Sequence, residues 1–312
     1  MKIKKYSLDR LGEWNDFVKV SKNTHFFFQR KYLEYHTDRF QDFSLMVYDD
    51  KDSLVAVLPA NLSGDTLFSH QGLTFGGFIV ADSMRTETMV RVFDELIAFL
   101  KLHDIKNLVY KCIPYVYHKK PAEEDRYALF LNDASLVRRD VTSTIYLGEE
   151  VRYSKGRKWT INKAKKENIE VCESKNLSAF WGILESVLED QHNAKPVHTL
   201  AEIEMLARLF PENIRLFLAS HEGNPISGAL VFENEIIAHT QYLANSSRGR
   251  EIGALDLLID HLIKNVFKNK RYFDFGISNE NQGRHLNAGL ISQKEGFGAR
   301  PVVHDFYELK IQ

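Results

Sequence analysis

The chain has 312 residues, of which 44% are hydrophobic and 27% are charged, and its formal net charge is -1. This balance is typical of a globular protein, and the near-zero charge gives no general argument for a nucleic-acid partner. The length favours two domains. No segment has the roughly 20 apolar residues of a membrane helix, and the first residues lack the apolar stretch of a secretory signal. We therefore expect a cytoplasmic protein with no membrane span.

In chain order, the same succession of elements is predicted twice. The first half contains a strand pair at 44–49 and 54–60, a helix at 84–102, a strand at 107–112, a helix at 121–135 and a strand at 141–147. The second half repeats it with strands at 215–220 and 225–231, a helix at 252–267, a strand at 272–277, a helix at 284–294 and a strand at 303–309. This repeat predicts an α/β fold with an α+β mixed sheet, built from two similar units at 1–150 and 151–312.

Local patterns support several of these helices. In the segment 84–102, apolar residues recur at intervals of three and four, as on the buried face of a helix: Met89, Val92, Phe93, Leu96, Ile97 and Leu100. Pro121 and the acidic residues after it indicate a helix start. Thr199 and Glu202 match a capping box.

The segment 149–168 is polar and basic, and it lies at the predicted junction between the units. Its cations are Arg152, Lys155, Arg157, Lys158, Lys163, Lys165 and Lys166. One interpretation is a solvated helix face. The other is a cradle for the phosphates of a nucleotide-linked substrate or of a tRNA end.

Two histidines and two carboxylates lie at 189–198, in a segment predicted to be a loop. Their spacing is not that of a metal site, and no cysteine accompanies them. We therefore expect no metal.

The candidate site with the most polar residues begins on the predicted strand 236–243. Since side chains alternate along a strand, we expect His239 and Gln241 on one face and Tyr242 on the other. A short loop of small and basic residues at 246–250 then leads to a helix. A strand, a small-residue loop and a helix start together present backbone amides that suit a pyrophosphate.

The segment from Arg250 to Ala254 resembles a degenerate form of the (Gln/Arg)-x-x-Gly-x-(Gly/Ala) pyrophosphate loop of the GNAT acyltransferase superfamily, with Leu255 at the last small position. The segment 290–297 resembles the end of the fourth GNAT helix, where a lysine and a Gly-Phe pair lead into the next strand. The resemblance implies acyl-CoA as donor substrate. It also implies that Arg248, Arg250, Gly253 and Ala254 hold the pyrophosphate.

The paired units resemble the FemABX-like double GNAT group, whose members transfer an acyl or aminoacyl group to an amine on a sugar or peptide. In that group the first unit tends to lose the cofactor loop, and here 79–84 has no compact glycine pattern. The second unit would therefore carry the donor site.

Acyl transfer to an amine needs a base and groups that orient the acceptor. His239 is the candidate base or orienting group, because histidine titrates near working pH. Asp274 alternates with aromatic residues on the strand 272–277, and we expect it in the same cleft, positioning substrate together with Gln241 and Tyr242. The acceptor side would include His70 and Gln71 in the first unit, and Asn279 after the Asp274 strand.

Together these features predict a cytoplasmic acyltransferase that moves an acyl group from acyl-CoA to an amine on an envelope or polysaccharide precursor sugar, with a small-molecule or nucleotide-sugar acceptor. One alternative keeps the fold and uses aminoacyl-tRNA as donor in peptidoglycan synthesis. Another is an inactive binding protein on the same fold.

Overall fold

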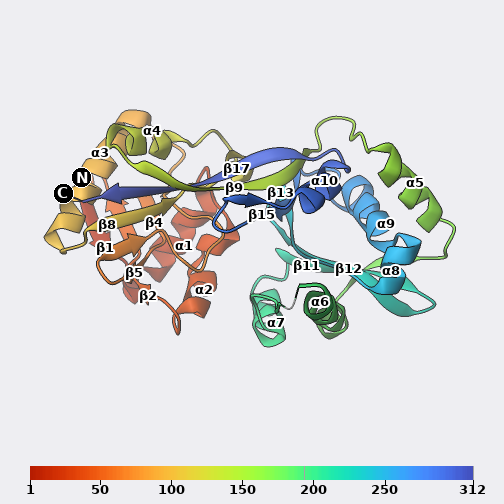
Figure 1. The fold of residues 1–312 in the computed structure, drawn as a ribbon. Coiled ribbons are helices and arrows are strands. Elements are labelled where there is room, and N and C mark those ends of the chain that lie inside the picture. Colours follow the sequence, from red (N-terminus) through yellow and green to blue (C-terminus); the bar gives the residue numbers. More distant parts are fainter. Residues whose placement is uncertain (193, 312) are drawn as a thin grey trace. The chain divides into compact units, whose positions relative to one another are not determined.

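The computed structural model describes residues 1–192 and 194–311, which fold into two compact units (Figure 1). Unit 1 comprises 1–140, 279–285 and 303–312, and unit 2 comprises 141–278 and 286–302. Neither unit is one continuous half of the chain. The division predicted at residue 150 concerns the sequence repeat and stays a prediction.

Unit 1 contains two sheets and the helices that cover them. In chain order its elements are β1 (Lys2–Lys5), η1 (Leu8–Arg10), α1 (Leu11–Val20), η2 (Phe26–Phe28), α2 (Arg30–Leu33), η3 (Glu34–His36), β2 (Gln41–Asp42), β3 (Leu45–Tyr48), β4 (Leu54–Leu58), β5 (Asn61–Ser63), β6 (Thr66–Phe68), β7 (Ile79–Val80), α3 (Thr86–Leu102), β8 (Asn107–Lys111), η4 (Tyr115–Tyr117), α4 (Glu124–Leu131) and most of β17 (Arg300–Lys310). One sheet has the order β1-β3-β4-β7, and the other includes β17-β8-β6-β5-β2. The strand β9 (Ser135–Tyr146) begins in unit 1 and ends in unit 2.

Unit 2 is built on the strand order β10-β11-β12-β13-β14-β9. Its elements are α5 (Lys155–Ala164), β10 (Glu170–Ser174), α6 (Leu177–His192), α7 (Leu200–Leu209), β11 (Ile214–His221), β12 (Asn224–Glu233), β13 (Ile237–Asn245), α8 (Ser247–Ile252), α9 (Ala254–His261), the π-helical η5 (Leu262–Val266), β14 (Tyr272–Ile277) and α10 (Ala288–Glu295). The short strands β15 (Asn279–Glu280) and β16 (His285–Leu286) pair with each other.

The predicted repeat is confirmed by the order and pairing of the elements. Each unit has an antiparallel hairpin, β3–β4 in unit 1 and β11–β12 in unit 2. Each also has one parallel pair joined through a helix, β6–α3–β8 and β13–α9–β14. Two parallel strands need a crossover connection, and the helix in the middle of each predicted half provides it.

Each unit buries its own apolar core. In unit 1 the predicted stripe on α3 is confirmed, with Met89, Val92, Phe93, Leu96 and Leu100 buried and Ile97 packed against them. In unit 2 the core lies under α9 and η5. It includes Ala238 of β13 and both Phe273 and Phe275 of β14.

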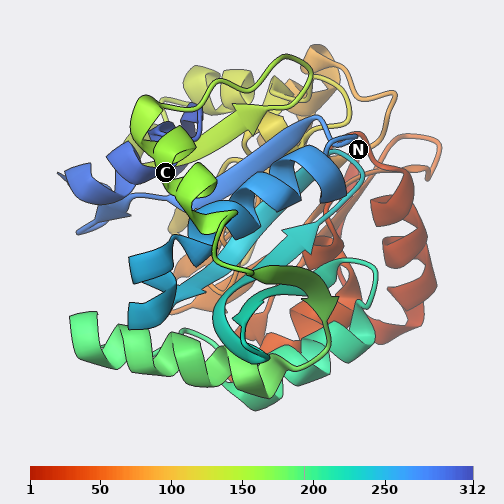
Figure 2. The ribbon, with the colours of Figure 1, turned by 90° about the vertical axis from the view of Figure 1, so that its right-hand side faces the viewer.

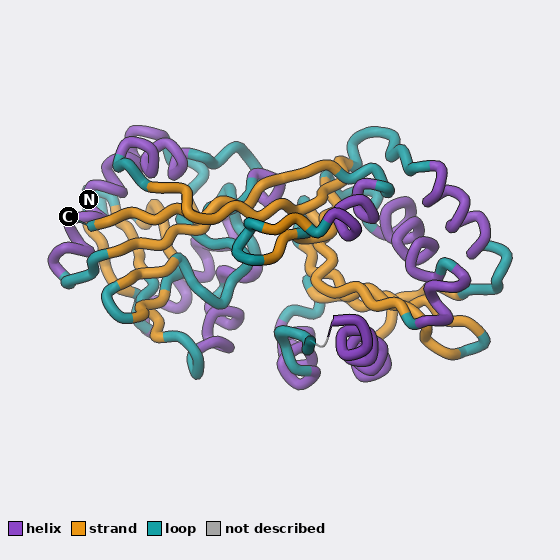
Figure 3. The backbone as a smooth tube through the Cα atoms, viewed as in Figure 1, coloured by secondary structure: helices purple, strands orange, loops and turns teal. Residues whose placement is uncertain are grey.

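The helices of unit 2 lie on two faces of its sheet. The helix α9 covers the face that bears Ala238 and Phe273, and Figure 2 shows it lying along the strands. On α6, Trp181 contacts Tyr242 of β13, whereas the neighbouring Leu243 packs on the α9 core. Figures 1 and 3 show α6 and α9 with the strands β11 and β12 between them. Residues that alternate with the α9 core along β13 and β14 therefore point to the α6 side.

Several element boundaries differ from the predictions. The helix predicted from Pro121 begins at Glu124, and the long helix predicted at 252–267 is divided into α9 and η5. Residues 189–192 lie in the last turn of α6, not in a loop. The capping box of Thr199 and Glu202 is confirmed. Of the two cysteines, Cys112 is buried but Cys172 is exposed.

Candidate active site

The two predicted catalytic residues lie in direct contact within unit 2. His239 on β13 is opposite Asp274 on β14, at the last position where these parallel strands pair. Nδ1 of His239 lies 2.6 Å from Oδ2 of Asp274. Because Ala238 and Phe273 belong to the α9 core, alternation directs both polar side chains to the opposite face of the sheet.

The carboxylate of Asp274 is fully buried and receives several hydrogen bonds. The hydroxyls of Thr142 and Thr144 on β9 donate to Oδ1 over 2.5 and 2.7 Å, and the backbone N–H of Gly276 donates to Oδ2 over 3.2 Å. Burial acts to raise the pKa of Asp274. The hydrogen bond and charge of His239 and the two threonine hydroxyls outweigh it and hold that pKa below its usual value. Asp274 is therefore an ionised hydrogen-bond acceptor.

This environment fixes the tautomer of His239. A carboxylate only accepts hydrogen bonds, so the proton of the 2.6 Å bond is on Nδ1. Nε2 is then the nitrogen that can take up a proton during a reaction. The side chain of His239 is 12% exposed, so the ring is close to the surface of its unit.

A break in β14 lies beside the imidazole. Pairing with β9 shifts register between Asp274 and Ile277, and Gly276 has a φ of +75°. A Cβ at Gly276 would lie 3.3 Å from Cε1 of His239, so only glycine leaves this side of the ring unobstructed. The bulge thus turns the strand away from β13 immediately after the His239–Asp274 pair.

A buried lysine of α10 holds the bulge in place. Nζ of Lys294 donates to the carbonyls of Gly276 and Ile277 over 2.9 and 2.8 Å, and to Oγ of Ser278 over 3.0 Å. Burial lowers the pKa of Lys294 to about 8, although the charge of Asp274 opposes this shift. Lys294 belongs to the segment 290–297 that resembles the GNAT fourth helix.

The predicted alternation of side chains on β13 is wrong beyond Thr240. A register shift opposite Leu230 and Val231 reverses the faces to which the following side chains point. Tyr242 consequently lies on the α6 side, where its hydroxyl is 2.7 Å from Nδ1 of His198. Gln241 falls at the bulge. The roles of Gln241 and Tyr242 in substrate binding stay predictions.

The predicted donor loop is largely helical in the structure. The segment 247–252 forms α8, capped by Ser246, and Gly253 separates it from α9 with a φ of +79°. The N–H groups of Gly249 and Arg250 bond to Ser246, and that of Gly253 bonds to the carbonyl of Gly249. The prediction of free amides is therefore wrong at these three positions.

The helix α5 also packs against this segment. A Cβ at Gly253 would lie 2.7 Å from Cγ2 of Thr160, and Ala254 is completely buried. The exposed guanidinium of Arg248 pairs with Glu251, and Arg250 donates to the carbonyl of Asn245. The amides of Gly249, Arg250 and Gly253 are therefore not available to a pyrophosphate in this conformation.

The remaining predicted residues lie in unit 1. His70 is buried, and burial, with the charges of His36 and Lys111, lowers its pKa to about 3. Gln71 forms two hydrogen bonds with Asn61, each of 2.8 Å. Asn279 begins β15. The acceptor-binding role of His70, Gln71 and Asn279 stays a prediction.

Sequence analysis missed Thr142 and Thr144, although the sequence contains a usable signal. They are two residues apart on a predicted strand, so both project from the same face. A pair of hydroxyls on one face of a strand indicates a buried polar partner when that face packs inside the protein.

Residues 155–282 match the protein family described as Acetyltransferase (GNAT) domain. This region contains β13, α8, α9 and β14, and thus both His239 and Asp274. Over these residues the chain is similar to a GNAT acetyltransferase domain.

Solved structures extend the likeness over the whole chain. FemX has 12% identity and a TM-score of 0.68, with 98% of this chain and 97% of FemX covered. L-PGS from Bacillus licheniformis has 11% identity and a TM-score of 0.59, covering 91% and 92% of the two chains. A tandem GNAT protein from the clavulanic acid biosynthesis pathway has 12% identity and a TM-score of 0.54, covering 100% and 98%. No curated protein matches the sequence. These likenesses, each at 12% identity or less, show a shared fold over nearly the whole chain.

The described residues contain no group of three or more His, Cys, Asp or Glu side chains placed to hold a metal ion. Across the same part of the chain, no helix has the length and apolar character needed to span a membrane.

Proposed function

We propose that this protein transfers an acyl group to an amine of a cell-envelope precursor, with His239 as the base and Asp274 as its positioning partner. The observation that carries the proposal is the 2.6 Å contact between Nδ1 of His239 and Oδ2 of Asp274. It stands at the point where β13 and β14 separate. A base held by a buried carboxylate and directed outward is the arrangement that amine deprotonation requires.

In the proposed reaction, Nε2 of His239 accepts a proton from the acceptor ammonium group, and the neutral amine attacks the acyl carbonyl carbon. A C–N bond forms, and the carbonyl carbon's bond to the leaving oxygen or sulfur breaks. The imidazolium returns its proton to the leaving group, and the second proton that the attacking nitrogen loses as the amide forms passes to solvent, so the enzyme regains its starting state. Asp274 stabilises the imidazolium by charge and keeps Nδ1 protonated throughout.

We further propose aminoacyl-tRNA as the donor, in preference to acyl-CoA. The bonded amides of Gly249, Arg250 and Gly253 support this choice, because these three N–H groups are not available to a pyrophosphate. The likeness to FemX also supports it, since FemABX-like proteins include users of aminoacyl-tRNA. The acceptor would be an amine on a sugar or peptide of an envelope precursor.

The test compares donors and uses one variant. Purified protein is given a set of charged tRNAs or a set of acyl-CoA thioesters, together with amine-bearing envelope precursors. Transfer is read as labelled product, and thioester use is also read as released thiol. We expect product from a charged tRNA and a loss of roughly 100-fold or more with His239→Asn. Transfer from acyl-CoA alone would overturn the donor assignment, and full activity of His239→Asn would overturn the catalytic one.

A further inference from the structure

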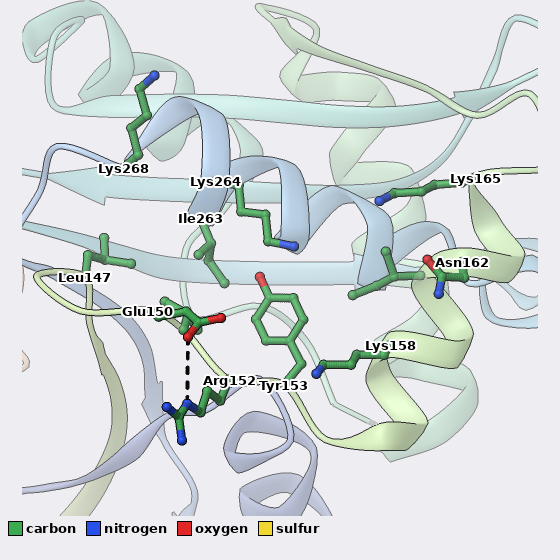
Figure 4. Close-up of a pocket in the computed structure, with 12 residues that line it drawn as sticks. Leu147, Glu150, Arg152, Tyr153, Lys158, Asn162, Lys165, Ile263, Lys264 and Lys268 are labelled. Carbon is green, nitrogen blue, oxygen red and sulfur yellow. Dashed lines mark ion pairs between the residues drawn. The ribbon is translucent and has the colours of Figure 1, made fainter.

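Unit 2 contains a recess of about 470 Å³ on the α5 side of its sheet (Figure 4). Its walls come from the segment 147–153, from α5 and from the end of the α9–η5 helix. This volume lies within the roughly 300–1,000 Å³ range of small-molecule sites. The recess lies on the face opposite to that of His239 and Asp274, so it is not part of the acyl-transfer site.

The charge of the recess is unusual for this chain. Five basic residues line it, against one acidic residue, Glu150, in a protein with a net charge of -1. The five are Arg152, Lys158, Lys165, Lys264 and Lys268. Arg152 lies 3.9 Å from Glu150, but both side chains are more than 80% exposed, so that pair contributes little.

The acidic groups nearby do not neutralise the remaining cations. Asp260, buried beneath the recess, pairs with Lys264 at 2.5 Å and lies 3.9 Å from Lys165. Lys158 and Lys268 have no ion-pair partner among the described residues. Lys158 on α5, which points toward Tyr153 in Figure 4, and Lys268 at the far end of the recess therefore lack a counter-charge.

The floor of the recess is apolar and contains one hydroxyl. Leu147, Val151, Ile161 and Ile263 line it together with Tyr153, whose ring lies in the middle of the side chains drawn in Figure 4. Nζ of Lys264 lies 4.8 Å from the centre of this ring. Burial and the neighbouring Asp260 carboxylate raise the pKa of Tyr153, so its hydroxyl stays protonated.

We propose that this recess binds a phosphate ester that also carries an apolar or planar group. The phosphate would lie between Lys158 and Lys264, whose ammonium groups both point toward Tyr153 in Figure 4, and the other part of the ligand would lie on Tyr153 and the apolar floor. Ammonium groups bind phosphate as point charges, and the apolar wall gains from water removal. A concave recess of this size favours a small ligand over a nucleic-acid backbone, which requires an extended groove.

The experiment measures binding directly and does not depend on turnover. ADP is titrated into the full chain by calorimetry. In a second arm, vesicles of phosphatidylcholine with phosphatidylglycerol are compared with vesicles of phosphatidylcholine alone by co-sedimentation. Binding of ADP assigns a soluble phosphate ester, and binding of only the anionic vesicles assigns a lipid phosphate.

Matched variants locate the binding. We expect Lys158→Ala to weaken binding about tenfold. Lys166→Ala removes the same charge from the turn after α5, outside the recess, and should weaken binding little. His239→Asn should bind as the wild type does, which separates this site from the proposed function. Thermal unfolding of each variant verifies that it is folded.

Three results would overturn the proposal. One is the absence of binding in both arms. Another is equal weakening by Lys166→Ala and by Lys158→Ala. The last is binding of uncharged tRNA that Lys158→Ala weakens, with no binding of ADP or vesicles, which would make the recess part of an RNA surface.

Discussion

Replacement of Asp274 by asparagine tests how His239 is held. The hydroxyls of Thr142 and Thr144 donate to one carboxylate oxygen and can donate equally to an amide oxygen. The amide NH2 of Asp274→Asn would then take the place of Oδ2, beside Nδ1 of His239 and the N–H of Gly276. An NH2 group donates to Nδ1 and therefore moves the imidazole proton to Nε2. The nitrogen that must accept a proton would already carry one.

The size of the effect follows from the lost interaction. A hydrogen bond to a charged group contributes about 1.5–3 kcal/mol, so its loss from the imidazolium state lowers the rate about 10-fold to 150-fold. The wrong tautomer adds to this loss, and the same exchange in Ser-His-Asp triads costs about 10⁴-fold. We expect Asp274→Asn to lower kcat within the range of about 10-fold to 10⁴-fold. The N–H of Gly276 loses its acceptor, which costs about 1–3 kcal/mol of stability.

The assay is single-turnover transfer of a labelled aminoacyl group, with urea unfolding of the same preparation. Asp256→Asn is the control, because Asp256 is also a partly buried carboxylate of unit 2 and pairs with Arg157 away from His239. Turnover by Asp274→Asn at the wild-type rate would refute the positioning role. An equal fall in both variants would point to a general loss of structure.

Three further predictions concern the surroundings of this site and the stability of unit 1. Gly276→Ala should lower kcat and cost about 1–2 kcal/mol of stability, because φ is +75° and the new Cβ would lie 3.3 Å from the imidazole. The control is Gly182→Ala, whose new Cβ would have nothing within 4 Å. This variant should not destabilise α6 in urea unfolding. Lys294→Met should leave the carbonyls of Gly276 and Ile277 without their donor and lower the free energy of unfolding by about 1–3 kcal/mol. A stability equal to that of the wild type would contradict the view that Lys294 holds the bulge in place. Burial raises the pKa of Asp125 from 3.8 to about 6, so the folded state favours the protonated carboxyl group. The free energy of unfolding should therefore fall by up to about 3 kcal/mol as pH rises from 4 to 6. Asp125→Asn, which keeps a partner for the hydroxyl of Tyr110, should remove that part of the pH dependence in denaturation measured across this range.

The sequence was sufficient to predict which elements recur and which residues carry polarity. Period-two alternation on 272–277 separated Asp274 from the core residues Phe273 and Phe275, and the structure has the same division. The contact of Asp274 with His239 could be proposed only from the fold, because 35 residues separate them and strand register depends on distant pairing.

Two features were beyond local pattern. The bulge opposite Leu230 and Val231 reversed the expected face of Tyr242, and nothing in the strand sequence marks it. The segment 246–250 has the small and basic residues of a phosphate loop, yet the same residues include Ser246, a good N-cap, followed by helix-forming residues. In the structure the segment 247–252 is helical and α5 packs on Gly253. This contact joins residues about 90 positions apart, so a local sequence pattern does not reveal it.

The discontinuous units bear on how the chain folds during synthesis. Val303 follows Asp140 by 163 residues, yet both belong to unit 1, where β17 pairs with β8 from Phe306 opposite Lys111 to Lys310 opposite Asn107. While the ribosome is still making unit 2, β8 therefore lacks that neighbour and presents an unpaired edge. Such edges invite pairing with other chains. A fragment ending at residue 150 would keep this edge permanently, so we expect it to aggregate where the full chain does not.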